Sequence, residues 1–158
     1  MWDVNGNRYI YYVMGVCSKL FGYGPNFIKE AVNNGMSKGF TYAGQHEPEI
    51  SVAERALKFI PIQDSTFKFA SSGIEIIQLA ISLIRSYTGK NKFIKFEGHY
   101  HGWADSVFFS VNPKLDSSGS NMSPIAVPDS SGIDINISEN ILICQCNNIE
   151  YIKVKLVG

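Results

Sequence analysis

The sequence predicts an α/β fold built around a mostly parallel sheet. Short apolar segments at residues 66–70 and 92–96 have the length and composition of buried strands, and residues 73–87 between them follow a helical pattern. A strand, a helix and a strand within about 30 residues are typical of a βαβ unit, whose strands run parallel and whose crossover is right-handed. Residues 141–144 have the composition of a further strand.

The other elements divide the chain into an N-terminal part and the start of an α/β domain. Asn5 and Gly6 lie between two strand-like runs, which is typical of a hairpin turn because both residues tolerate positive φ. Helices are predicted over 26–38, over 48–59 and from 147 onward, and a long loop rich in Ser, Pro, Gly, Asn and Asp over 112–140. We therefore expect a hairpin and helices in residues 1–60 and the first part of a large α/β domain in residues 61–158.

The composition is that of a soluble globular protein, with 45% hydrophobic and 18% charged residues among 158. Fourteen basic and fourteen acidic side chains cancel, so no net charge favours nucleic acid or an anionic membrane. No apolar run approaches the roughly 20 residues that span a bilayer, and no signal-peptide pattern opens the chain. We expect a cytoplasmic protein that binds small molecules, with Cys17, Cys144 and Cys146 as reduced thiols.

Ser72 and Gly73 open the helix that follows residues 66–70. Ser72 and Glu75 have the spacing of a capping box, in which the serine accepts a hydrogen bond from a backbone N–H group and the glutamate reaches back. Helix capping by itself explains the presence of these residues at the start of the helix. Ligand binding is the alternative, because this helix start would lie at the carboxyl edge of a parallel sheet and Gly73 would leave backbone N–H groups accessible to an anion such as phosphate.

A second cluster of polar and aromatic side chains follows the strand predicted over 92–96. His99 and His101 could suggest a metal, but no third ligand has a convincing spacing, so we expect no metal site. Tyr100 would lie at the sheet edge, one strand away from the candidate phosphate site. An aromatic ring in that place suits stacking on a flat heterocycle.

The conspicuous motifs are DVNGNRYI, GYG, TYAGQHEPE, FASSGIEIIQLAISLIRSYTGKNKFIKFEGHYHGW and VPDSSGI, in that order. Their combination resembles the class-III, pyridoxal-phosphate-dependent aminotransferases, and within them most closely the glutamate-1-semialdehyde 2,1-aminomutase subgroup. The resemblance is colinear over essentially all 158 residues. Ser-Gly-x-Glu together with Phe-Glu-Gly-x-Tyr-His-Gly makes it specific.

The resemblance implies a fold-type-I transferase with pyridoxal 5'-phosphate as its cofactor. The cofactor-binding positions that it implies are Ser72, Gly73, Ile74, Tyr100, His101 and Gly102. By this resemblance, Gly73 and Ile74 offer backbone N–H groups to the phosphate, and Tyr100 stacks on the pyridine ring. It further implies a small amino-acid-like substrate and a homodimer.

The sequence also departs from the family pattern. Ile74 stands where the aminomutase subgroup usually has threonine, so a hydroxyl contact to the phosphate is lost, and Ile76 replaces the usual alanine. Tyr11 and residues 15–17 also differ from many members, which leaves the substrate preference open. The lysine that binds the cofactor and the aspartate that pairs with the pyridine nitrogen lie in the later half of family members, so no catalytic residue is assigned, and Lys90 is interpreted as a solvated turn residue.

The predicted function is therefore part of an aminotransferase or aminomutase that moves an amino group on a small amino acid or aldehyde. The chain, expected to be an internal fragment or a truncated product, would supply the phosphate cradle and the stacking tyrosine. One alternative is a noncatalytic α/β fragment without activity of its own. Another is a metal-binding module that uses His99, His101 and the cysteines.

Overall fold

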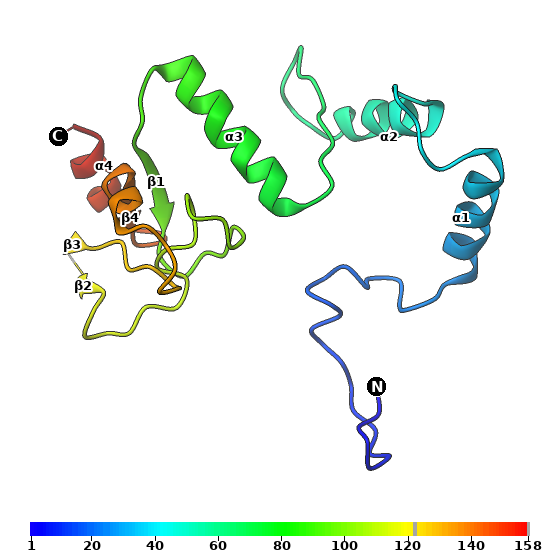
Figure 1. Cartoon of the computed structure of the whole chain (residues 1–158), viewed down its shortest axis with the longest axis horizontal. Coiled ribbons are helices and arrows are strands. Elements are labelled where there is room, and N and C mark those ends of the chain that lie inside the picture. The colour runs from blue at the N-terminus through cyan, green and yellow to red at the C-terminus, as the bar shows by residue number, and fades with distance from the viewer. Residues whose placement is uncertain (122, 158) are drawn as a thin grey trace. The chain divides into compact units, whose positions relative to one another are not determined.

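The computed structural model describes residues 1–121 and 123–157 (Figure 1). Internal contacts divide the chain into two compact units, Met1–Phe67 and Lys68–Gly158. The first unit contains the hairpin turn and the helices α1 and α2, and the second contains α3, the strands β1 to β4, a short 3-10 helix and α4. Each unit is described by itself.

The first unit opens with a hairpin turn. Gly6 has a φ of 83°, a left-handed conformation that glycine adopts without a steric penalty. Trp2 and Arg8 form an antiparallel bridge across this turn. The Asp3 carboxylate accepts a hydrogen bond of 2.9 Å from the backbone N–H of Asn7, which stabilises the turn from its inner side. The hairpin predicted from Asn-Gly is confirmed as this short, bridged turn.

Two helices complete the elements of the first unit. α1 spans Asn26–Lys38, as predicted, and α2 spans Glu47–Leu57, with Pro48 in the first turn where its missing N–H has no cost. No residue of either helix is buried. Their apolar faces are exposed in this chain, with Phe27 at 58% and Ile50 at 46%, so the buried core is built by the second unit.

Helix α3 spans Gly73–Thr88 in the second unit and agrees with the prediction to within one residue. Ser72 is its N-cap in an extended conformation. Gly89 ends it in the left-handed conformation, with a φ of 67°, and donates its backbone N–H to the carbonyl of Arg85 at 2.9 Å. Capping residues therefore determine both ends of this helix.

A parallel pair of strands forms the centre of the second unit. β1, Phe93–Phe96, pairs with β4, Ile141–Cys144, so that Phe93 lies opposite Ile141. One cluster of the buried core consists of Phe109, Ile141 and Ile143, with Phe93, Ala126, Ile133 and Ile137 packed against it. The predicted α/β class with a parallel sheet is confirmed.

The strand predicted over residues 66–70 is wrong, because these residues belong to no strand of the structure. The parallel neighbour of β1 is β4 instead, and the described part of their connection, residues 97–140, contains no α-helix. Apolar residues in a short run favour an extended, buried backbone, but a strand forms only where a second backbone lies alongside it. Residues 66–70 are also exposed and not buried, so composition alone did not identify the strand that pairs with β1.

Short elements interrupt the loop predicted over 112–140. β2, Gly119–Ser120, pairs antiparallel with β3, Ser123–Pro124, and a 3-10 helix, Ile135–Asn140, leads directly into β4. α4, Ile149–Val157, follows β4 and confirms the helix predicted near the end of the sequence. This connection returns the chain to the edge of β1, which allows the parallel pair to form.

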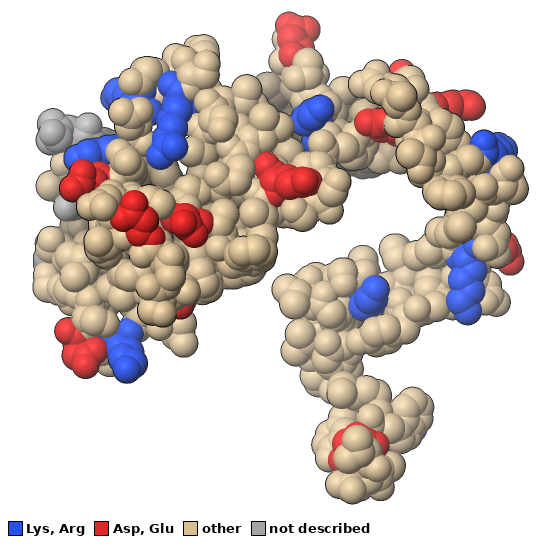
Figure 2. All heavy atoms as spheres, in the orientation of Figure 1, with Lys and Arg blue, Asp and Glu red and all other residues tan. Residues whose placement is uncertain are grey.

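Charged side chains are scattered between uncharged ones on the face shown in Figure 2. Among the described residues, no helix is long and apolar enough to cross a membrane. None of the three cysteines forms a disulfide.

Candidate functional site

The start of α3 is a capped helix N-terminus with available backbone donors. Ser72 Oγ accepts a hydrogen bond from the N–H of Glu75 at 3.3 Å, and the Glu75 carboxylate accepts one from the N–H of Ser71 at 2.7 Å. The predicted capping arrangement is confirmed. The first N–H groups of a helix have no partner within it, and in the described part of the chain neither Gly73 nor Ile74 donates to a side chain. Two donors therefore point out of the helix toward any group placed at its start.

A tight turn follows the carboxyl end of β1 and carries Tyr100. The N–H of His99 donates back to the carbonyl of Phe96 at 3.3 Å, and the N–H of Gly98, which has a φ of 77°, donates to the carbonyl of Ser110 at 2.9 Å. The Tyr100 ring packs edge-on against Phe108, with the ring centroids 6.3 Å apart. Tyr100 is nevertheless 61% exposed, so part of the ring remains accessible for stacking.

An open cavity of about 500 Å³ lies between these two segments of the second unit. All six residues predicted for the cofactor line it, and the complete lining is Ser72, Gly73, Ile74, Ile76, Ile77, Tyr100, His101, Gly102 and Trp103. Gly102 allows the close approach of the two segments, because a Cβ built on it would lie 2.4 Å from Cγ1 of Ile74. The structure thus brings together residues that are almost 30 positions apart in the sequence.

The geometry fits a phosphorylated aromatic ring. A Cβ built on Gly73 meets nothing within 4 Å, so no protein atom crowds the side-chain position of Gly73 at the start of α3. Exposed N–H groups and the positive end of the helix dipole favour an anion there. The aromatic rings of Tyr100 and Trp103 lie in the same cavity and offer surfaces for a flat heterocycle.

The protonation of His101, which lines the cavity, depends on burial and on nearby positive charge. Burial lowers the pKa of His101, and the neighbouring Lys95 and His99 lower that pKa further. The imidazole of His101 is therefore mostly neutral at pH 7. Burial also lowers the pKa of Lys95, while the charges of Asp129 and Glu97 oppose that shift.

The comparison with protein families decides the class of this chain. The model of the aminotransferase class-III family matches residues 1–147. The chain belongs to the class-III aminotransferase family. A glutamate-1-semialdehyde 2,1-aminomutase from Albidiferax ferrireducens is 33% identical over 152 residues, which make up 96% of this chain and 33% of that protein.

Solved structures support the fold assignment. An omega-transaminase from Sphaerobacter thermophilus matches with a TM-score of 0.87 and 27% identity, over 99% of this chain and 35% of that one. A transaminase solved with PLP bound matches with a TM-score of 0.81 and 24% identity, over 99% and 35%. The predicted fold of pyridoxal-phosphate-dependent transferases is confirmed, and this class-III chain spans about a third of the length of the relatives that it matches.

The metal-binding alternative finds no support in the described residues of this class-III chain. Residues 1–121 and 123–157 contain no group of three or more His, Cys, Asp or Glu side chains placed to hold a metal ion. The rings of His99 and His101 lie 6.1 Å apart and approach each other edge to face. Lys90 lies exposed beyond the end of α3, as expected for a turn residue.

Two residues near the cavity were not singled out from the sequence. Ile77 lines the cavity from the second turn of α3, and its helical spacing from Gly73 could have revealed it. Lys95 lies in β1 and lines a smaller apolar cavity of about 180 Å³ that shares Ile77 and His101 with the candidate site. The sequence signal that could have revealed Lys95 is a lysine inside the apolar run Phe-Ile-Lys-Phe.

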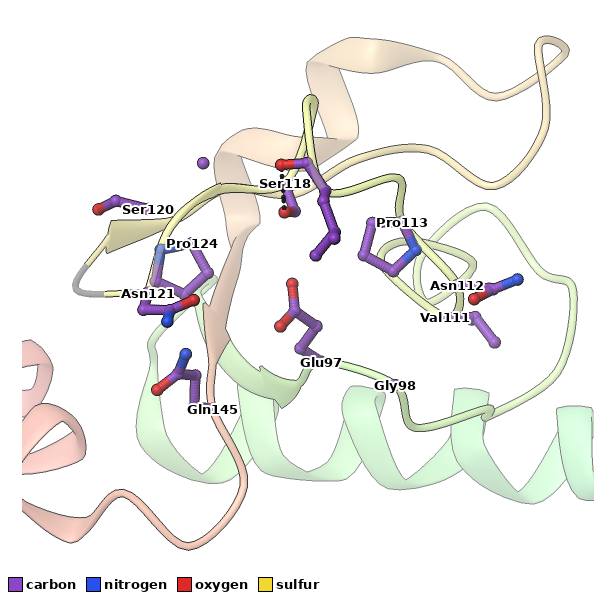
Figure 3. Close-up of a pocket in the computed structure, with 12 residues that line it drawn as sticks. Glu97, Gly98, Val111, Asn112, Pro113, Ser118, Ser120, Asn121, Pro124 and Gln145 are labelled. Atoms are coloured by element: carbon purple, nitrogen blue, oxygen red, sulfur yellow. Dashed lines mark hydrogen bonds between the residues drawn. The ribbon is translucent and has the colours of Figure 1, made fainter.

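A third cavity, of about 280 Å³, lies beyond the carboxyl ends of β1 and β4 (Figure 3). Glu97 follows β1, Gln145 follows β4, and Figure 3 shows the Glu97 carboxylate directed into the cavity beneath Ser118. The rest of the lining comes from Gly98 and from the segment between Val111 and Pro124. None of the six predicted cofactor residues lines this cavity, so the candidate site stays with α3 and the turn after β1.

Proposed function

We propose that this chain forms the phosphate-binding and ring-stacking side of a pyridoxal 5'-phosphate site in a class-III aminotransferase or aminomutase. One observation supports this most strongly: the residues implied by the family resemblance, from two separate segments, line a single cavity. The family match over residues 1–147 supports the same cofactor class.

The residues of the chain would bind and orient the cofactor. The backbone N–H groups of Gly73 and Ile74, with the Ser72 hydroxyl beside them, would hold the phosphate, because helix N-termini stabilise anions. Tyr100 would stack on the ring, and the mostly neutral imidazole of His101 would border it without adding a full positive charge. Bound pyridoxal phosphate supplies an electron sink for moving an amino group.

The proposed reaction is transfer or internal exchange of an amino group on a small, amino-acid-like substrate, in a homodimer. The similarity to curated aminomutases and to a solved omega-transaminase supports both kinds of reaction, and no catalytic residue is assigned in this chain. The alternative remains a noncatalytic α/β chain that has the family fold but no activity of its own.

Gly73→Val tests the phosphate site. The valine Cβ would meet no protein atom within 4 Å, so the substitution fills the cavity at the start of α3 without a clash. Loss of charge-assisted hydrogen bonds worth about 1.5–3 kcal/mol should weaken binding of pyridoxal phosphate roughly 10-fold to 100-fold. Absorbance titration of the purified chain measures this, and pyridoxal, which lacks the phosphate, should bind both proteins equally.

Gly35→Val is the matched control. Gly35 lies within α1, also has open space around a built Cβ, and is not among the residues that line the cavity. Gly35→Val therefore changes a helical glycine that is not part of the candidate site. Equal pyridoxal phosphate affinity in wild type and Gly73→Val would exclude the phosphate assignment. Absence of saturable binding by the wild-type chain would favour the noncatalytic alternative.

A further inference from the structure

Lys95 is a buried charged residue that does not line the candidate cofactor cavity. It is the third residue of β1, lies opposite Ile143 of β4 and is only 2% exposed. Lysine is almost never fully buried unless it is paired, because removing an ammonium group from water is costly. Its position inside an apolar strand therefore requires partners that compensate for this burial.

The partners of Lys95 are backbone carbonyls of the turn that carries Tyr100. Its Nζ donates to the carbonyl of His99 at 2.7 Å and more weakly to that of Phe96 at 3.4 Å. Both carbonyls belong to the turn that leaves β1, one at its start and one directly before Tyr100. The ammonium group thus joins the strand to the turn from inside the protein.

The charges around Lys95 come from two segments. Glu97 lies in the turn itself and Asp129 follows the β2–β3 hairpin, and both favour the charged ammonium group against burial. His99 and His101 lie on the same turn, and Lys95 disfavours a second positive charge on His101. The Asp129 carboxylate accepts a hydrogen bond of 2.8 Å from the N–H of Val111, and the ion pairs among the described residues include none between Asp129 and Lys95.

We propose that Lys95 is a positioning residue that holds the turn Phe96–Gly102, and with it Tyr100, against the cofactor cavity. Its two carbonyl contacts replace the hydrogen bonds that a flexible turn would make with water. We assign Lys95 no covalent attachment to the cofactor, because its Nζ is engaged by the carbonyls of His99 and Phe96 and Lys95 does not line the candidate cofactor cavity. The link to cofactor binding rests on the proposed function, whereas the role in ordering the turn does not.

Lys95→Met tests the role of the ammonium group, since methionine is close to the lysine stem in length and keeps the apolar contacts. The background is Trp2→Phe, which leaves Trp103 as the single tryptophan and as a reporter next to Tyr100. We expect amide hydrogen exchange of residues 97–103 to become at least tenfold faster, and Trp103 fluorescence to be quenched more easily by acrylamide. Exchange of β4 and of the centre of α3 should remain as in the background protein.

Ile143→Val is the control, because Ile143 is the strand partner of Lys95 and a core residue that makes no contact with the turn through hydrogen bonds. Ile143→Val should loosen the core, but it should not raise the amide hydrogen exchange rate of residues 97–103 more than that of the strands. Unchanged exchange of the turn in Lys95→Met would overturn the inference. The inference would also be overturned if Lys95→Met raised the exchange rates of β1, β4 and the turn uniformly and by the same factor as Ile143→Val. If Lys95→Met does not fold, Lys95→Gln keeps an N–H donor on a shorter stem and should show an intermediate, turn-selective increase.

Cofactor titration separates this inference from the proposed function. Lys95→Met should weaken pyridoxal phosphate and pyridoxal by the same factor, on the order of tenfold, because both would stack on Tyr100. Gly73→Val should weaken only the phosphorylated form. If the background protein binds neither compound, the proposed function fails, and the exchange experiment still decides the role of Lys95.

Discussion

Gly102→Ala is expected to destabilise the second unit by bringing a methyl group into contact with α3. Gly102 is buried and has a φ of 99°, and a Cβ built on it would lie 2.4 Å from Cγ1 of Ile74. Unstrained carbon contacts begin at about 3.5 Å, so the overlap is about 1 Å. Overpacking of this kind costs about 1–3 kcal/mol, and a left-handed backbone adds about 1–2 kcal/mol for a residue with a Cβ. We expect a total loss of about 2–5 kcal/mol in the free energy of unfolding.

A double-mutant cycle with Ile74→Ala separates the two contributions. The alanine removes Cγ1 and Cδ1 of Ile74, so the clash with residue 102 disappears while the backbone strain remains. Gly102→Ala should then cost only about 1–2 kcal/mol in the Ile74→Ala background. Urea unfolding followed by circular dichroism measures all four proteins. A cost below about 0.5 kcal/mol for Gly102→Ala, or an equal cost in both backgrounds, would refute the close approach of the turn and α3.

Tyr100→Ala is expected to cost about 1 kcal/mol or more of pyridoxal phosphate affinity by absorbance titration, whereas Tyr100→Phe should retain it; equal damage would indicate hydrogen bonding instead of stacking. Because the pKa of His101 is lowered in the folded chain, the unfolded chain binds more protons as the pH falls below about 6.5, so stability should decrease there. Urea midpoints at pH 7.5 and 5.5 should differ less in His101→Gln, and an unchanged difference would contradict this. Borohydride reduction after addition of pyridoxal phosphate should label no single lysine stoichiometrically, and mass spectrometry that finds saturable labelling at one lysine would show the lysine assignment to be wrong.

Much of the candidate site could be predicted from the sequence because its parts are local motifs. The Ser72 cap, the reach of Glu75 and the glycine Gly73 lie within four residues, and their spacing has a direct structural meaning. The turn after β1 could be predicted for the same reason, since it follows an apolar strand. The roles of these residues toward the cofactor came from the family resemblance and remain predictions.

The residues missed by the sequence analysis depend on neighbours that are distant along the chain. Lys95 resembles any strand lysine until its Nζ is found beneath the carbonyl of His99. Ile77 is one of several apolar residues on α3, and only the placement of the turn shows that it borders the cavity. Burial and cavity shape are properties of the packed unit, so a local pattern does not contain them.

The sequence by itself determined the fold class of this protein and located its α-helices to within two residues at the ends that the structure describes. Helix α3 begins at Ser72 and ends at Gly89 through hydrogen bonds that span at most four residues, and such bonds are set by residue type and spacing. Only the tertiary structure decided that β4 and not residues 66–70 lies beside β1, and that Gly102 meets Ile74. Strand pairing and close packing join segments separated by long connections, whose geometry depends on the free energy of the whole unit.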